Sequence, residues 1–320
     1  MNKLNQIWIF FIVLCASVGA NAQDAHFSQI YTNSILVNPA FTGHELQPKI
    51  MMAYRNQWPG IDKSFRTFYV AYTQYSNFFN GGIGGYVYRD VAGENDYANL
   101  RAAIDYAYRL KINRKNAFQW SMEVTYFQYS INWETMTFAD MLDINQGFVN
   151  QTNEMIPVGT AKGGIDVSSG AVWMGEKFFG GVAVHHLTKP ELLVFGENNY
   201  LHRKLSLHGG VNFYLKTPLE KFKITPSVLY LKQQMSQELN IGINIAQEYI
   251  NLGFWYRKKD ALIVVVGLKY NEWHFAYSYD YTLPSFGANN SRGAHEMSLS
   301  YKFNAPQKRI KHRQFSCPTF

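Results

Sequence analysis

The chain has 320 residues, of which 16% are aromatic, 24 are glycine and 10 are proline. At this length one large β domain or two ordinary domains are expected, and the aromatic and glycine content favours strands. Lys and Arg outnumber Asp and Glu by 7, and several of the excess charges lie together in residues 308–313. Because the excess forms no basic stripe across the chain, composition gives no support to nucleic-acid binding.

An export signal occupies the start of the chain. A short polar stretch leads into the apolar run 7–20, which ends at an Ala-Asn-Ala cleavage site. This pattern predicts a secretory signal peptide, with a mature chain that begins at Gln23. The apolar run is too short to remain as a helix across a bilayer of roughly 30 Å. Its removal also removes Cys15, so Cys317 remains alone and no intrachain disulfide is expected.

Apolar and polar residues alternate along most of the mature chain. Residues 98–110 carry apolar or amphipathic side chains on one parity and charged or polar ones on the other. A helix would scatter those charges around its circumference, whereas a strand separates them onto two faces. Runs of this kind predict about fourteen strands, near residues 49–58, 65–75, 83–92, 97–110, 117–130, 164–174, 178–187, 204–215, 222–232, 238–246, 249–257, 261–270, 272–281 and 294–303.

Two architectures can bury alternating strands: a soluble β-sandwich and an outer-membrane barrel. This chain is exported, its strand number is even, and short turns alternate with longer connections, above all residues 131–163. An outer-membrane barrel explains all three features, and its strands need roughly 9 to 11 residues to cross at a tilt. We therefore expect an all-β fold, a transmembrane antiparallel β-barrel of about fourteen strands in the outer membrane. Both termini are expected in the periplasm, and Tyr106, Tyr108 and Trp120 are candidates for aromatic belts that contact outer-membrane lipid.

The stretch HFSQIYTNSILVNPAFTG, residues 26–43, has no strand period of its own. Asn38-Pro39 favours a turn, and Gly43 permits a backbone excursion before the first strand. Phe27, Tyr31 and Phe41 give the stretch apolar surface to bury. We expect it to pack inside or across the periplasmic mouth of the barrel as a plug that closes the lumen, and the alternative is a disordered leader.

These interpretations divide the chain into four parts. Residues 1–22 are the signal peptide, 23–48 an N-terminal periplasmic segment, 49–303 the β-barrel and 304–320 a basic periplasmic C-terminal tail.

The start of the mature chain, QDAHFSQIYTNSILVNPAFTG, resembles the PorP/SprF family, outer-membrane barrels of Bacteroidetes associated with type IX secretion and gliding motility. Later blocks resemble that family in the same order: KFFGGVAVHHLTKP, HRKLSLHGGVNF, ITPSVLYLK, AYSYDYTL and GAHEMSLSYKF. The clearest departure from the family pattern is the long 131–163 loop, which leaves the identity of the binding partner open. A structural role is expected for the motif residues His26, Phe27, Ser28, Gln29, Asn38, Pro39, Ala40, Phe41, Gly43, His186, Leu187, Pro190, Pro226, Ser227, Tyr277, Ser278, Tyr279, Asp280, Gly293, His295 and Glu296.

The resemblance implies an interaction protein that supports type IX secretion, surface anchoring of a secreted adhesin-like protein, gliding motility or several of these. Its implied partners are components of the type IX machinery and a secreted cell-surface protein, such as a large adhesin with a C-terminal sorting domain. A passive or ligand-specific outer-membrane channel is the first alternative, and an outer-membrane enzyme is the second. Inward residues such as Arg101, Arg109, Asp105 and Glu123 are compatible with a pore lining or with salt bridges to a plug.

No catalytic, cofactor-binding or metal-binding residue is predicted. His185 and His186 are adjacent in a strand pattern, so their side chains are expected on opposite faces. The same alternation separates His295 from Glu296, and the chain has no phosphate-binding loop, dinucleotide fingerprint or G-x-S-x-G motif. Near the last hairpin Ser278, Asp280, His274 and Glu296 share the inward parity, which a polar network in the lumen explains more simply than catalysis.

The C-terminal tail carries a cluster of four basic residues, Lys308, Arg309, Lys311 and Arg313. One interpretation is a solvated tail. The other is a partner-binding surface that docks on an acidic or peptidoglycan-linked component of the secretion machinery, where opposite charge accelerates encounter.

Overall fold

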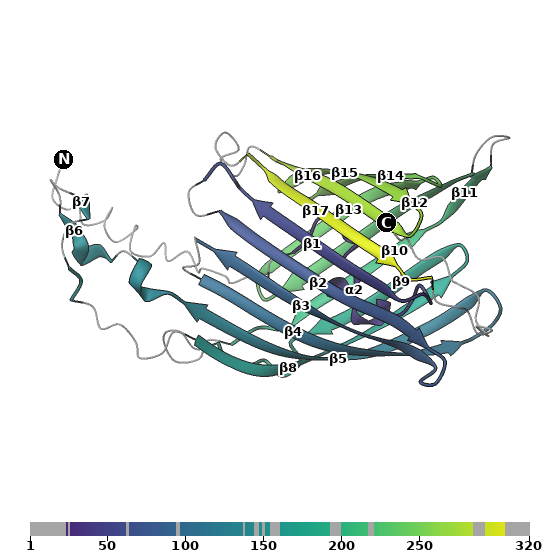
Figure 1. Cartoon of the computed structure of the whole chain (residues 1–320), viewed down its shortest axis with the longest axis horizontal. Coiled ribbons are helices and arrows are strands. Elements are labelled where there is room, and N and C mark those ends of the chain that lie inside the picture. The colour runs from purple at the N-terminus through teal and green to yellow at the C-terminus, as the bar shows by residue number, and fades with distance from the viewer. Residues whose placement is uncertain are drawn as a thin grey trace, which may run out of the picture.

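Fourteen antiparallel strands close into a barrel in the computed structural model (Figure 1). The structure describes residues 24, 26–61, 64–93, 97–136, 138–143, 147–148, 151–153, 161–192, 200–216, 221–283 and 292–304. The barrel strands are β1 (Lys49–Gln57), β2 (Phe65–Ser76), β3 (Gly81–Ala92), β4 (Tyr97–Lys111), β5 (Asn116–Ile131), β8 (Ala161–Gly175), β9 (Phe178–His185), β10 (Lys204–Val211) with β11 (Phe213–Lys216), β12 (Lys221–Gln233), β13 (Ser236–Ala246), β14 (Ile250–Arg257), β15 (Ala261–Tyr270), β16 (Trp273–Thr282) and β17 (Ala294–Lys302). Closure comes from the antiparallel pairing of β1 with β17, from Lys49 opposite Lys302 to Gln57 opposite Ala294. The fourteen predicted strands and the barrel are confirmed.

One strand of the barrel is interrupted. β10 and β11 both pair with β12 in the same antiparallel register, so they are two halves of a single strand that breaks at Asn212. Continuation of that register places the break opposite Thr225 and Pro226, and Pro226 has no backbone N–H to donate to the ladder. The family-motif residue Pro226 therefore explains why the strand is interrupted between β10 and β11.

The strands face lipid with their apolar sides and the lumen with their polar sides. In β4, Asp105 and Arg109 are at most 3% exposed inside the barrel, whereas Ile104 and Tyr108 on the other parity are 76% and 43% exposed. Trp120 on β5 also faces outward. A soluble sandwich would reverse this distribution, because its apolar side faces a common core.

The two ends of the barrel differ in the length of their connections. At one end, hereafter the turn end, residues 77–80, 112–115, 176–177 and 271–272 form short turns, and here β1 begins and β17 ends. The longer connections lie at the other end, hereafter the loop end. The longest of them joins β5 to β8 and contains η2 (Trp133–Thr135), η3 (Ala139–Met141) and the two-residue strands β6 (Leu142–Asp143) and β7 (Gly147–Phe148), which extend away from the barrel in Figure 1.

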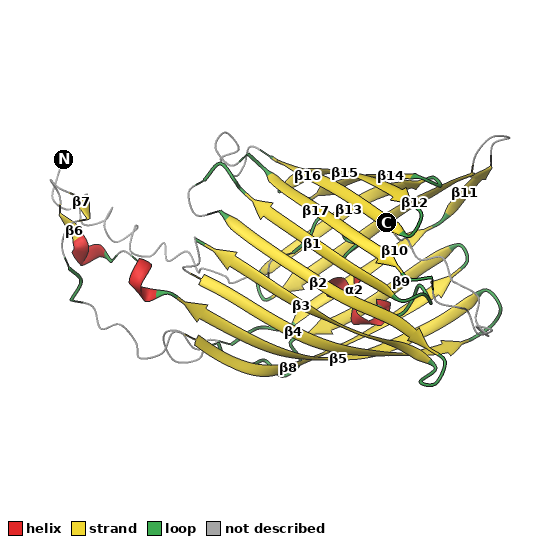
Figure 2. Ribbon diagram, in the orientation of Figure 1, coloured by secondary structure: helices red, strands yellow, loops and turns green. Residues whose placement is uncertain are grey.

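Two short helices precede β1. α2 (Ser34–Val37) and η1 (Pro39–Phe41) appear in red among the barrel strands in Figure 2, and η1 contacts β4, β5 and β8. No helix in the described part of the chain is both long enough and apolar enough to span a membrane.

Candidate functional site: the N-terminal segment inside the barrel

Residues 26–46, hereafter the lumen segment, run along the inside of the barrel from the loop end to the turn end. Just before the segment, the Asp24 carboxylate lies 2.5 Å from Arg101 and 3.2 Å from Lys204, near the loop-end starts of β4 and β10. At the far end, Glu45 lies 2.9 Å from Lys49 and 2.7 Å from Lys302, where β1 begins and β17 ends. The segment is therefore anchored by ion pairs near both ends of the barrel.

The sequence predicts that residues 23–48 are a periplasmic segment whose motif packs inside or across the mouth of the barrel, and the described residues of this range lie inside the barrel along its length. Asp24 and Lys49 lie at opposite ends of the barrel, so the described part of that range cannot sit on a single side. Chain length permits the path, since about twenty residues can reach up to roughly 70 Å when extended, and the hydrocarbon core is about 30 Å thick.

The start of the lumen segment meets the last motif block, on β17, near the loop end. The Glu296 carboxylate, which is 0% exposed, accepts hydrogen bonds from the backbone N–H groups of Ser28 at 2.7 Å and Gln29 at 3.2 Å. Asn33 donates its side-chain amide to the same carboxylate at 3.2 Å. A single acidic side chain of β17 thus satisfies three donors of the lumen segment that would otherwise be buried without partners.

Two arginines bring the Ser28 hydroxyl into a charged network. Arg55 and Arg257 donate to this hydroxyl at 2.7 and 2.9 Å, and the hydroxyl donates to Asp280 at 2.5 Å. Arg55 also pairs with Asp280 at 2.9 Å and with Glu296 at 3.2 Å. Burial strengthens each of these hydrogen bonds, and a charge that lost its partner here would lower the free energy of unfolding. The network therefore fixes the position of the segment.

Aromatic side chains anchor the segment along its length. Phe27 packs against Tyr69 with ring centroids 5.8 Å apart, and Tyr31 packs against Trp255 at the same separation. Phe41 lies over the imidazole of His208 with a centroid separation of 4.9 Å. The three predicted aromatic anchors are buried, with no more than 8% of any of them exposed.

Asn38 and Pro39 join the segment to the wall formed by β8 and β9. The Asn38 side-chain oxygen accepts from the Ala40 N–H at 2.9 Å and caps η1, whose first residue is Pro39. Its amide nitrogen donates to the carbonyls of Ala171 and Val182, each at 3.2 Å. The turn that Asn-Pro predicts is therefore also a point of attachment to two strands.

Gly43 adopts the left-handed backbone conformation that its sequence context predicts, with φ of 66°. Its N–H donates to the Thr73 hydroxyl at 2.5 Å, and its carbonyl accepts from Arg109 at 3.0 Å. The backbone of the segment touches the backbone of β3 here, since a Cβ on Gly82 would lie 1.9 Å from the Thr42 oxygen. Only glycine fits on the β3 side of this contact.

The predicted separation of His185 and His186 is wrong. Both imidazoles are buried, at 5% and 4% exposure, and their centroids lie 6.3 Å apart. β9 ends at His185, and His186 has φ of 59°, which interrupts the alternation of faces. His186 bridges the carboxylates of Asp24 at 2.8 Å and Asp166 at 2.6 Å.

Ionisable side chains lie near both ends of the segment. Burial raises the pKa of Asp24, but the positive charges of Arg101 and Lys204 outweigh that effect and hold this pKa well below its ordinary value. Burial lowers the pKa of His44 to about 4, so its imidazole is neutral at pH 7. Burial raises the pKa of the neighbouring Glu45, but the positive charges of Lys49 and Lys302 outweigh that effect and hold this pKa well below its ordinary value. Stable negative charges therefore lie both just before the segment and at its turn end.

Solved outer-membrane proteins of distant sequence resemble this barrel. Omp33 of Acinetobacter baumannii is 6% identical, with 81% of this chain and 100% of that chain covered and a TM-score of 0.46. The toluene transporter TodX of P. putida is 11% identical, with 86% and 95% covered and a TM-score of 0.48. No curated protein matches the chain significantly.

Residues 19–301 match the family described as type IX secretion system membrane protein PorP/SprF. The chain belongs to the PorP/SprF family. This PorP/SprF protein is thus a type IX secretion-associated barrel of the outer membrane, as its sequence motifs predict.

Several motif residues of this PorP/SprF protein lie outside the network. Tyr277 and His295 face outward and share a hydrogen bond of 2.7 Å, and Tyr279 packs on the same imidazole. Ser278 lies inside, 3.4 Å from the side-chain nitrogen of Gln29. Gly293 has φ of 66°, and its carbonyl accepts from the Trp58 N–H at 2.8 Å. Leu187 donates its N–H to the Val167 carbonyl at 2.9 Å, the Pro190 carbonyl accepts from Leu201 at 2.8 Å, and the Ser227 hydroxyl donates to the Thr225 carbonyl at 3.3 Å. The tail residues Lys308, Arg309, Lys311 and Arg313 lie outside the described residues.

Sequence reasoning missed five residues that hold the segment. Asp24 lies within the family-like start of the mature chain but was not singled out, and neither were Arg55, Asp166, His208 and Arg257. Their signal was available, because each of the last four lies on the inward parity of its strand. A charged or imidazole side chain in the lumen requires a partner, and the segment supplies or shares it.

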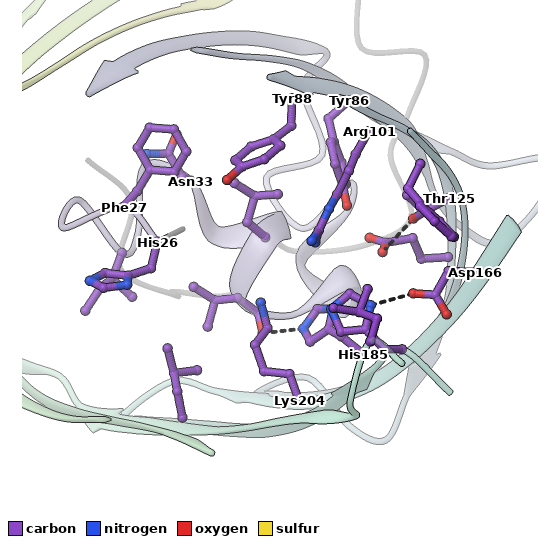
Figure 3. A pocket seen from close by; sticks show the side chains of 18 of the residues that line it. His26, Phe27, Asn33, Tyr86, Tyr88, Arg101, Thr125, Asp166, His185 and Lys204 are labelled. Carbon is purple, nitrogen blue, oxygen red and sulfur yellow. Dashed lines mark hydrogen bonds and ion pairs between the residues drawn. The ribbon is translucent and has the colours of Figure 1, made fainter. Parts of the chain in front are cut away.

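A cavity of about 60 Å³ remains beside the segment. Figure 3 shows His26 and Phe27 on the left of it, Tyr88 and Arg101 at the top, Asp166 on the right and Lys204 at the bottom. Its lining is mixed, with apolar and charged groups side by side. Within the described ranges, no three His, Cys, Asp or Glu side chains gather closely enough to hold a metal ion.

Proposed function

We propose that this PorP/SprF protein is a closed, non-enzymatic scaffold of the type IX secretion system, and that it binds partners at its two ends without conducting cargo through its lumen. One observation carries this proposal: the lumen segment is buried along the barrel interior and held by hydrogen bonds and ion pairs. A lumen filled in this way leaves the loop end and the turn end as the surfaces for partners.

The lengths of the connections support an orientation for the proposed scaffold. Outer-membrane barrels of bacteria carry short periplasmic turns and longer outer loops, so the loop end faces the cell exterior and the turn end the periplasm. Residue 304 follows β17 at the turn end, which supports a periplasmic tail. Asp24 then lies in the half of the lumen nearer the exterior.

The connection 132–160 is the proposed contact for a secreted surface protein, such as a large adhesin with a C-terminal sorting domain. It is the longest loop at the loop end, and Leu142 within it is 50% exposed. Loops on a rigid scaffold commonly carry recognition, which supports surface anchoring or gliding as the finer role.

The basic tail is the proposed contact for a machinery component in the periplasm. Lys308, Arg309, Lys311 and Arg313 supply a local positive charge that suits an acidic or peptidoglycan-linked partner.

Two replacement strains test these contacts. In one, residues 136–158 are replaced by a short Gly-Ser linker, and in the other the four basic tail residues are changed to Gln. Both proteins should reach the outer membrane as heat-modifiable barrels. We expect the loop strain to lose most of its surface-bound secreted protein, and the tail strain to lose most of its co-purifying machinery subunits.

Lys111→Gln, Arg114→Gln, Lys115→Gln and Lys177→Gln together form the charge-matched control, since these four basic residues are exposed at the turn end. This control should leave both readouts unchanged. Normal display in the loop strain and normal co-purification in the tail strain would contradict the scaffold proposal.

A channel is the second candidate function, and the cavity of about 60 Å³ beside the segment favours it. In that case the lumen segment would be a gate that moves. An enzyme has less support, because Asp280 and Glu296, the inward acids near the last hairpin, are already engaged by Arg55 and by the segment.

A further inference from the structure

The outward face of the barrel is nearly free of charge. Among the strand residues whose side chains the structure describes, three with an acidic side chain, a lysine or an arginine lie on the outward parity: Arg66, Arg89 and Lys232. All three lie toward the loop end, since β2 begins there and β3 and β12 end there. The remaining outward positions are apolar, aromatic or uncharged polar.

Arg66 and Arg89 are neighbours on this face. Arg66 lies opposite Val91 and Phe68 lies opposite Arg89, so the two arginines are diagonal neighbours across two successive outward-facing cross-strand pairs. The four side chains line a shallow groove of about 430 Å³ on the outside of the barrel. Two guanidinium groups thus flank one open, partly apolar depression.

Neither guanidinium forms an ion pair with an acidic side chain in the described ranges. Like charges in neighbouring cross-strand positions repel one another, and an arginine on the lipid face is strongly destabilising at mid-membrane and costs little near the interface. Their place close to the strand ends puts them at the interface, at the depth of lipid headgroups. An anion at that depth would remove the repulsion.

Guanidinium groups bind phosphate oxygens in bidentate geometry, which makes arginine the preferred residue for such an anion. Below the pair, Phe68, Val70 and Val87 are 50%, 44% and 52% exposed and continue toward the centre of the strands. A ligand with a phosphate head and acyl chains matches both parts of this surface.

We propose that Arg66 and Arg89 form a binding site for the phosphorylated headgroup of lipopolysaccharide in the outer leaflet. The two guanidinium groups clamp one phosphate, and the exposed apolar side chains below them contact the first acyl chains. The site belongs to the outer surface and is independent of the lumen segment and of any secretion partner.

Native mass spectrometry of the purified barrel with lipopolysaccharide lipid A tests this site. We expect the double variant Arg66→Gln, Arg89→Gln to bind at least about tenfold more weakly, which is about 1.4 kcal/mol. Wild-type protein should show a similar loss with dephosphorylated lipid A. The double lysine variant, which keeps the charge and loses the bidentate geometry, should bind with intermediate affinity.

Lys232→Gln is the matched control, because Lys232 is the third outward cation and lies on a different strand pair. It should bind lipid A as wild type does, and inorganic phosphate alone should not compete. Equal binding by the double glutamine variant, with heat-modifiable folding retained, would overturn the proposal. So would equal binding of the dephosphorylated lipid. If that variant keeps lipid affinity and loses a co-purifying protein, the face is a protein-binding surface instead.

Discussion

Replacement of Glu296 by alanine is expected to lower the free energy of unfolding by about 3 to 5 kcal/mol, the usual cost of breaking a buried ion pair. The Glu296 carboxylate accepts from the backbone N–H groups of Ser28 and Gln29 and from the Asn33 amide, and it pairs with Arg55. Alanine leaves the two backbone N–H groups and the Asn33 amide without this acceptor in a closed interior, and Arg55 keeps Asp280 and the Ser28 hydroxyl. The first turn of the lumen segment should then detach from β17.

Two matched variants separate this effect from general damage to the strand. Glu296→Gln keeps a carbonyl acceptor and loses the charge, so its loss of stability should be smaller. His295→Ala is adjacent in β17 but faces outward, where it contacts Tyr277, and should cost less than about 1 kcal/mol. Urea titration of the folded gel band gives the free energies, and hydrogen exchange reports on residues 26–33. If Glu296→Ala and His295→Ala were equally stable, the proposed anchoring by Glu296 would be wrong.

Replacement of Gly82 by alanine is expected to displace the turn-end half of the segment. The added Cβ would lie 1.9 Å from the Thr42 oxygen and 2.8 Å from the Gly43 nitrogen, both backbone atoms that cannot rotate away. Displacement would break the bond from Arg109 to the Gly43 carbonyl at 3.0 Å and the bond from Gln119 to the Thr42 carbonyl at 2.6 Å. We expect a loss of about 2 kcal/mol or more, since buried polar groups lose their partners.

Hydrogen exchange over residues 38–46 measures that displacement, and protection there should fall by at least about tenfold. Gly267→Ala is the control, because Gly267 also lies on the inward parity of a strand and the nearest atom to its added Cβ is 3.4 Å away. Wild-type protection in Gly82→Ala would show that the segment does not contact β3 as described.

The barrel was predictable because its two faces require opposite chemistry. Ile104 and Asp105 are neighbours in β4, yet one faces lipid and the other the lumen, and the sequence records this difference at every second position. Strand positions and the closing strand followed from that pattern. The inward facing of Asp280 and Glu296 followed as well.

The contacts of the site were not predictable in the same way. Ser28 and Glu296 are 268 positions apart, and which inward residues meet a segment in the lumen depends on the register at which the barrel closes. Alternation also fails where a strand ends, as at His186, whose positive φ turns its imidazole to the same side as that of His185. The course of the lumen segment through the whole barrel has no signature in its sequence, since it has no repeating period.

Conductance in planar lipid bilayers tests most directly whether the lumen segment closes this PorP/SprF barrel. We expect the intact protein to show no steady pore, because residues 26–46 occupy the interior. Deletion of residues 24–44 should produce a steady, larger conductance, provided that the deleted protein still shows the folded, heat-modifiable gel band. A large and steady pore in the intact protein would contradict the account and favour the channel.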